Sequence, residues 1–114
     1  MLSDTATRAL RDIASHIELA ASFSAGTTYE TFKDDMLRLH AVTRCLEIIS
    51  EASRRLPEEL KARHPAIEWR EMAAAGNFYR HEYEDVAARR VRETLTHPLP
   101  PLRAAVQQEL ARIG

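Results

Sequence analysis

Apolar residues recur every three or four positions along most of the chain, and this spacing limits the possible folds more than any other feature. Leu10, Ile13 and Ile17, for example, follow one another at intervals of three and four. Such intervals place side chains on one face of an α-helix. No segment alternates apolar and polar residues with the period of two that is typical of a β-strand. The pattern therefore predicts an all-α fold.

Gly, Pro and capping residues predict where the helices begin and end. We expect a first helix over roughly 4–23, followed by Gly26 in a left-handed conformation. Thr27 and Glu30 form a capping-box pattern that opens a short segment near 28–35. Further helices are expected over 39–56, directly after Pro57, from Ile67 through Gly76, over 86–95, and from Pro100 onward. The 114 residues have the length of one ordinary domain, so we expect a single domain over 1–114.

The composition excludes several classes of protein. Apolar residues make up 45% and charged residues 29% of the chain, so neither disorder nor a membrane protein is expected. Sixteen basic and seventeen acidic residues give nearly balanced charge, which argues against a protein that coats DNA. No DNA-specific binding is expected, although a local basic patch can still bind RNA. The single cysteine, Cys45, excludes an internal disulfide and is expected to be buried. No apolar run approaches the ~20 residues of a membrane span and no hydrophobic signal core is present, so the expected location is the cytoplasm.

Widespread catalytic motifs are missing from the sequence. It holds no Gly-rich phosphate loop, no Gly-x-Ser-x-Gly elbow and no His-Glu-x-x-His zinc helix. The five histidines also lack the spacing of metal ligands. We therefore expect neither a bound metal nor a cofactor.

One segment, residues 76–85, is dense in functional groups. If a helix continues through it, Asn77, Arg80 and His81 stand at i, i+3 and i+4 and share one face. An imidazole that moves a proton, a guanidinium that holds phosphate oxygens and an amide that orients either suit a phosphodiester. The alternative is a solvated, charge-rich helix end with Phe78 packed in the core.

Several pieces of the chain carry a resemblance to a known family. The pieces are Leu46–Ala52 (LEIISEA), Leu56–Leu60 (LPEEL), Ile67–Met72 (IEWREM), Asn77, His81-Glu82-Tyr83 and Leu99–Leu102 (LPPL). In this order and spacing they resemble the HepT-like branch of the HEPN superfamily. Together with the first helix they cover nearly the whole chain.

The resemblance implies a compact HEPN-type bundle of about five helices with an antiparallel up-down core. Such a bundle pairs with a second copy and places an RNA-cleaving site in the cleft between the two protomers. Members of the family typically act as toxins of toxin–antitoxin pairs. Their antitoxin is a minimal nucleotidyltransferase, which silences the toxin by attaching adenylyl groups to a tyrosine near the active site. The partners implied for this chain are thus a second copy, such a nucleotidyltransferase and an RNA substrate.

Site residues are carried over position by position. The resemblance makes His81 the catalytic histidine, Asn77 its polar neighbour and Tyr83 the tyrosine that receives the modification. Where the family has its arginine, five positions before the histidine, this chain has Gly76, which can neither hold a phosphate nor stabilise negative charge. Arg80 is a candidate substitute, because a residue four positions after Gly76 lies on the same helical face.

Two hypotheses about function follow from these residues, and a third from the fold alone. In the first, the chain is a metal-independent endoribonuclease in which His81 transfers protons and Arg80 stabilises the developing negative charge. In the second, Gly76 marks a catalytically degenerate HEPN module that binds a nucleotidyltransferase or RNA. In the third, the chain is an all-α interaction protein that shares only the fold.

Other residues near the motif have weaker assignments. Tyr79 is a candidate to stack on a base, with dimer or core packing as the alternative. Glu47 and Glu51 are expected to pair with basic residues near the site, with a catalytic role as the alternative, and Trp69 is expected in the core. Three arginines follow the motif: Arg89, Arg90 and Arg92. They either extend a phosphate-binding surface or belong to a solvated helix face, and the sequence favours neither.

Overall fold

The computed structural model describes residues 2–78 and 84–113, and the regular structure in these ranges is entirely α-helical. The helices are α1 (Asp4–Ser24), α2 (Tyr29–Lys33), α3 (Met36–Arg54), α4 (Glu58–Ala62), α5 (Trp69–Phe78), α6 (Glu84–Thr96) and α7 (Leu99–Ile113). The all-α prediction is confirmed, and α2 and α4 are the short helices expected near residue 28 and after Pro57. None of the described helices is long and apolar enough to cross a membrane.

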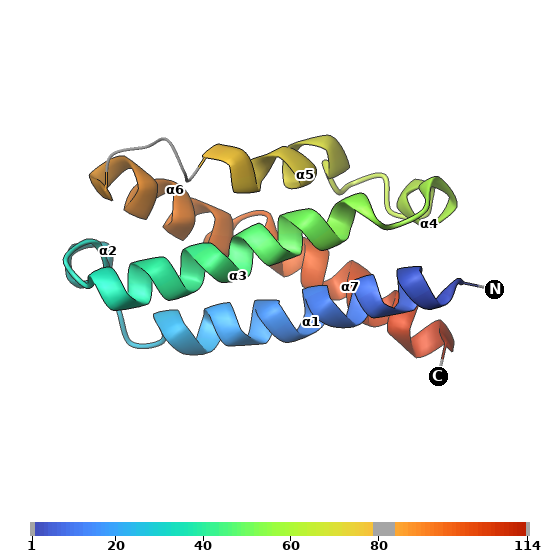
Figure 1. The fold of residues 1–114 in the computed structure, drawn as a ribbon, viewed down its shortest axis with the longest axis horizontal. Helices are drawn as coiled ribbons and strands as arrows, with labels where there is room; N and C mark the ends of the chain where they lie inside the picture. Colours follow the sequence, from blue (N-terminus) through green and yellow to red (C-terminus); the bar gives the residue numbers. More distant parts are fainter. Residues whose placement is uncertain (1, 79–83, 114) are drawn as a thin grey trace.

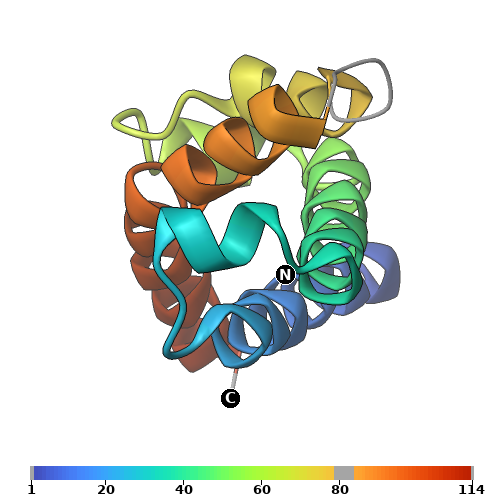
Figure 2. The same ribbon diagram turned by 90° about the vertical axis from the view of Figure 1, so that its left-hand side faces the viewer.

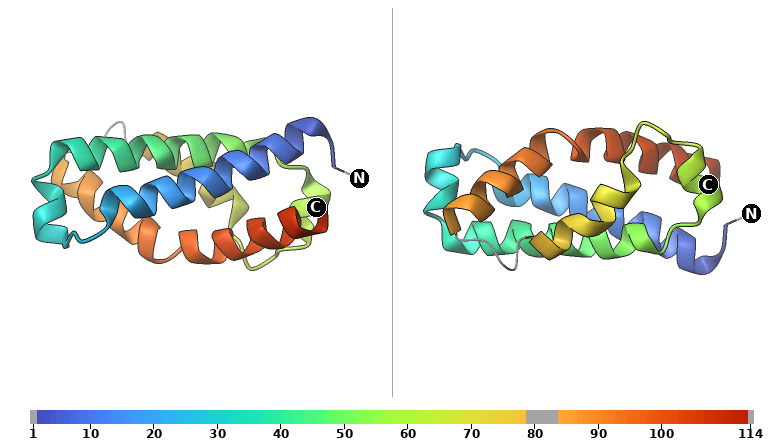
Figure 3. Two further views of the ribbon diagram at one scale, coloured as in Figure 1. Left: turned by 90° about the horizontal axis from the view of Figure 1, so that it is seen from below. Right: turned by 90° about the horizontal axis from the view of Figure 1, so that it is seen from above.

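The longer helices lie side by side with alternating directions (Figure 1). α1 and α3 form an antiparallel pair, and α5 runs back over α3. α6 and α7 then run in the direction of α3, with a bend where Pro98 separates them, and α7 packs against α1 (Figure 3). α2 crosses the end of the bundle and packs on α6 (Figure 2). The antiparallel up-down core is as expected.

The turn between α1 and α2 differs in one detail from the expectation. Gly26 has a φ of 75°, the left-handed conformation predicted for it. The capping box, however, lies one residue later than the Thr27–Glu30 pattern indicated. The N–H of Thr31 donates to Thr28 Oγ1 at 3.2 Å, and the N–H of Thr28 donates to Thr31 Oγ1 at 2.9 Å. A threonine hydroxyl thus replaces the carboxylate that usually completes this motif.

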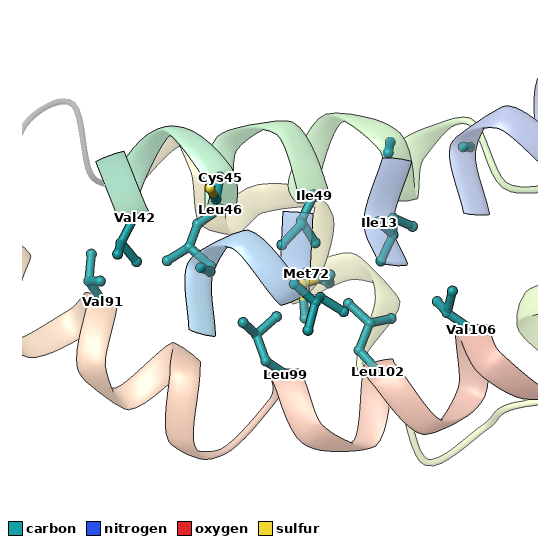
Figure 4. Packing of buried hydrophobic residues seen from close by; sticks show 14 of the residues in the cluster. Ile13, Val42, Cys45, Leu46, Ile49, Met72, Val91, Leu99, Leu102 and Val106 are labelled. Atoms are coloured by element: carbon teal, nitrogen blue, oxygen red, sulfur yellow. The ribbon is translucent and has the colours of Figure 1, made fainter. Parts of the chain in front are cut away.

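One apolar stripe from each long helix fills the core. Figure 4 shows Val42, Leu46 and Ile49 of α3 on one side and Leu99 and Leu102 of α7 on the other. Each of these side chains is at most 3% exposed. Because burying such a side chain contributes about 1.5–3 kcal/mol, this packing is the main source of stability.

Cys45 and Trp69 lie where the sequence predicted. Cys45 is 4% exposed, and burial raises the pKa of its thiol. Trp69 is partly buried against the core, and its indole N–H donates to the carbonyls of Lys61 (3.1 Å) and His64 (3.2 Å). The tryptophan therefore also satisfies carbonyls at the end of α4.

A buried ion cluster joins the end of α4 to α7, at the opposite end of the bundle from α2 (Figure 1). Glu109, which is 2% exposed, accepts from Arg63 Nη2 at 2.7 Å and Nε at 3.2 Å. His64 Nε2 lies 2.6 Å from the same carboxylate. Chiefly because Arg63 donates to it, the pKa of Glu109 is lowered to about 2. The cluster fixes the α4 region on α7.

We predict a loss of stability on acidification that depends on Glu109. A carboxyl whose pKa is lowered from 4.5 to about 2 by folding stabilises the protein fully above pH 4.5 and loses this effect as the pH falls toward 2. At about 1.4 kcal/mol per pKa unit, the contribution is on the order of 3 kcal/mol. Urea unfolding of Glu109→Gln at neutral pH should show a loss of about 2–3 kcal/mol, and a weaker pH dependence than the parent between pH 5 and 3. Glu58→Gln, whose side chain is 93% exposed, is the control and should behave as the parent does.

Candidate functional site

α5 carries the first part of the predicted site. The helix continues through Gly76 and Asn77 and ends at Phe78. Tyr79, Arg80, His81 and Tyr83 lie outside the described residues, and the side chain of Asn77 is not described either. That these groups share one face therefore stays a prediction. What the structure describes is how the helices before and after this segment are held: α5 packs on α3, and α6 packs on α2.

Side chains of α3 fix the position of α5. Ser50, which is 1% exposed, donates through Oγ to the carbonyl of Ala73 at 2.7 Å. Arg54 Nη2 donates to the same carbonyl at 2.5 Å. Ala73 lies one turn before Gly76 and Asn77 on α5. These two contacts therefore set where the candidate site sits along α3.

The two acids expected to pair with basic residues near the site pair with arginines of α3 and its C-terminal cap. Glu47 Oε2 lies 3.8 Å from Arg44, and Glu51 lies 3.5 Å from Arg54 and 3.8 Å from Arg55. Glu47 is half-buried and lies one turn from Ser50, on the side toward the end of α5, because α3 and α5 run in opposite directions (Figure 1). α3 thus places a carboxylate beside the part of α5 that carries the motif.

α2 and α6 are joined by side-chain contacts. Arg92 Nη1 donates to Thr27 Oγ1 at 3.0 Å, and its guanidinium lies 5.8 Å from the centre of the buried Phe32 ring. Tyr29 has two cations near its ring, Lys33 Nζ and the Arg89 guanidinium carbon, each 5.7 Å from the ring centre. The three arginines Arg89, Arg90 and Arg92 therefore differ in their surroundings. Arg92 holds α2 on α6, whereas Arg89 and Arg90 are exposed.

A groove of about 680 Å³ separates α5 from α6 and the start of α7. Its apolar lining includes Ile67, Met72, Ala75 and Pro101. Its charged lining includes Glu68, Arg70, Glu71, Arg90, Glu93 and His97. The pKa of Glu71 is raised, because its protonated form donates a hydrogen bond to the neighbouring Glu68 carboxylate and because the charge of Glu68 repels a second negative charge. Among the described residues no group of three or more His, Cys, Asp or Glu side chains is placed to hold a metal ion.

Sequence reasoning missed the contacts that anchor α5. Ser50 and Arg54 stand four positions apart on α3, and Glu47 precedes them by one turn. They form a polar stripe at helical spacing beside the apolar one, and this stripe was the available signal. The groove had no comparable signal, because it depends on how far apart α5 and α6 lie.

The chain is similar to a family and to proteins that are named as ribonucleases. The model of the family described as "Ribonuclease HepT-like" matches residues 13–109. The chain is 38% identical to a Thermococcus cleftensis protein named "Probable ribonuclease HepT", over 87% of this chain and 90% of that protein. It is 32% identical to a "Putative RNase" of Caldanaerobacter subterraneus, over 90% of this chain and 92% of the relative. No solved structure matches the chain significantly.

We predict that Ser50→Ala loosens α5 specifically. Losing one buried hydrogen bond costs about 1 kcal/mol, which lowers the melting temperature by roughly 4 °C in a protein of this size. Ser53→Ala is the matched control, because Ser53 is also buried on α3 but donates only within its own helix, to Ser50 O at 2.7 Å. Amide hydrogen exchange of α5 should be faster in Ser50→Ala and unchanged in Ser53→Ala. Equal effects of the two variants on α5 would contradict the assignment.

Proposed function

Since the chain belongs to the HepT-like ribonuclease family, we propose that it is a metal-independent endoribonuclease and the toxin of a toxin–antitoxin pair. The observation that carries the proposal is the family match over residues 13–109, which includes the whole motif segment 76–85. The chain's relatives are matched over most of their own length, so the similarity concerns the entire domain.

The proposed reaction is an internal transesterification of RNA. A base takes the proton of a ribose 2′-hydroxyl, and the 2′-oxygen attacks the adjacent phosphorus. The bond to the 5′-oxygen breaks, and an acid gives that oxygen a proton. The products are a 2′,3′-cyclic phosphate and a free 5′-hydroxyl. The imidazole of His81 is suited to proton transfer near neutral pH, and the amide of Asn77 to orienting the phosphate or the imidazole.

Pairing of two copies is part of this proposal. A single site with one histidine needs that group to act as base and then as acid. In a two-fold symmetric dimer the two His81 side chains face the same cleft, so one serves as base and the other as acid.

Arg80 takes the place of the missing family arginine in this proposal. Gly76 lies in the last turns of α5 and offers no side chain for the phosphate. A guanidinium one turn further along the chain is long enough to reach back over the position that the glycine leaves open. Its fixed positive charge would stabilise the phosphorane in the transition state.

Silencing by a minimal nucleotidyltransferase is the regulatory part of the proposal. Tyr83 follows His81 by two residues, and its hydroxyl is the acceptor we assign for the adenylyl group. An adenylyl group at this position adds a negative charge and a large ring system beside the histidine, which excludes RNA from the cleft.

Gly76 favours a second candidate function. If Arg80 does not replace the family arginine, the chain is a degenerate HEPN module that acts by binding the nucleotidyltransferase or RNA. The two candidates differ in whether the purified chain cuts RNA.

We predict that the purified chain cleaves total cellular RNA in the presence of EDTA and that His81→Ala does not. Losing the proton-transfer group should lower the rate by a factor of about 10²–10⁴. His16→Ala is the matched control, because this histidine lies on α1 and bonds only to neighbouring groups of its own helix. Gel analysis of the RNA measures the rates. Equal cleavage by parent and His81→Ala would contradict the proposal, and so would a requirement for divalent metal.

We predict that Arg80→Ala lowers the cleavage rate by about 10²–10³-fold, the usual effect of removing a group that stabilises transition-state charge. Restoring the family arginine in the double variant Arg80→Ala with Gly76→Arg should recover much of the activity. The single variant Gly76→Arg tests the alternative. A large gain of activity in Gly76→Arg, with no loss in Arg80→Ala, would show that Arg80 does not fill the arginine's place.

A further inference from the structure

α6 borders two surfaces. On one side it borders the groove toward α5, and on the other it packs on α2 (Figure 2). The groove lining carries three carboxylates, Glu68, Glu71 and Glu93, beside Arg70, Arg90 and His97. The described groove lining therefore has no excess of positive charge to attract the phosphates of a nucleic acid.

The α2 side presents an exposed cation, Arg89, which forms no ion pair with the described residues. Its guanidinium lies over the ring of Tyr29, at 5.7 Å from the ring centre. An aromatic ring in this position attracts the cation without neutralising its charge. Two acids of this region have other partners: Glu30 pairs with Lys33 at 3.1 Å, and Asp35 pairs with Arg38 at 3.2 Å.

This surface is also held in place. Arg92, one turn after Arg89, joins α6 to Thr27, which precedes α2, and to the buried ring of Phe32 in α2. These contacts hold α2 against the middle of α6. Arg89 lies five residues into α6, which is about 7.5 Å of helix rise from Glu84. It thus lies close along the chain to the motif that precedes α6.

On the basis of the proposed ribonuclease activity, we infer that Arg89, positioned by Tyr29, binds the RNA strand beside the cleavage site. Its guanidinium donates to a backbone phosphate, and the face turned away from Tyr29 stacks on a base. Lys33 lies near the same ring, but its charge is paired with Glu30, so Arg89 is the cation assigned to the phosphate. The substrate strand then runs over α2 and not along the groove between α5 and α6.

The test measures RNA binding separately from cleavage. The probe is a short fluorescein-labelled single-stranded RNA, and the protein is His81→Ala, so that the probe stays intact. Fluorescence anisotropy gives the dissociation constant at several salt concentrations. Adding Arg89→Ala should weaken binding about tenfold and reduce the slope of log affinity against log salt by about 0.7, the value for one lost phosphate contact on a single strand. Arg112→Ala, at the exposed end of α7, removes the same charge and should change nothing.

Further variants distinguish positioning from general effects on the fold. Arg89→Lys keeps the charge but loses the planar group, so it should restore the salt slope and only part of the affinity. Tyr29→Leu should weaken binding when Arg89 is present and have no further effect in Arg89→Ala, whereas Tyr29→Phe should bind normally. A purely structural role of Tyr29 would weaken binding equally in both backgrounds and would overturn its assignment.

Failure of this inference is distinguishable from failure of the proposed function. If the parent chain cleaves RNA but Arg89→Ala binds it as tightly as the background does, the inference is wrong and the ribonuclease stands. Weaker binding by Arg90→Ala with no effect of Arg89→Ala would place the strand in the groove and also overturn the inference. If the parent does not cleave RNA and the background does not bind it, both are wrong.

Discussion

The packing of α3 on two different partners is the constraint on which the rest of the structure depends. Its apolar stripe packs against α1 and, across the core, faces α7. Its polar stripe holds α5 through Ser50 and Arg54, which donate to the single carbonyl of Ala73. A buried hydroxyl satisfied in this way tolerates little sliding, because a shift leaves a polar group unpaired. The register of α5, and with it the position of Gly76 and Asn77, follows from α3.

The two ends of the bundle differ in how their charged side chains are placed. At one end Glu109, Arg63 and His64 form a buried cluster whose charges are satisfied within the protein. At the other end, Arg89 projects an exposed charge from the surface of α6. Charges neutralised inside the fold stabilise it, whereas an exposed guanidinium is available to a ligand. This division agrees with a substrate that approaches the end of the bundle where α2 lies.

The sequence predicted the helices well because each helix is determined locally. The apolar spacing of Leu10, Ile13 and Ile17 indicates α1 without knowledge of its neighbours, and Pro98 marks the boundary between α6 and α7. The capping box at Thr28 was misplaced by one residue, because Thr27 and Thr28 are chemically equivalent and only the backbone geometry separates them.

The site was less predictable for a different reason. The residues of the motif came from a resemblance, and their side chains lie outside the described part of the chain. Contacts between distant segments, such as Arg89 with Tyr29 or Ser50 with Ala73, depend on helix packing that no local pattern contains. The same holds for the groove between α5 and α6.

The chemistry of the RNA ends distinguishes the proposed reaction from other routes of cleavage. Total RNA is treated with the purified chain in EDTA, and the new termini are identified by enzymatic end-labelling. We expect 2′,3′-cyclic phosphates and 5′-hydroxyls, the products of attack by the neighbouring 2′-oxygen. New ends that carry 3′-hydroxyls and 5′-phosphates, or no new ends, would rule out this reaction.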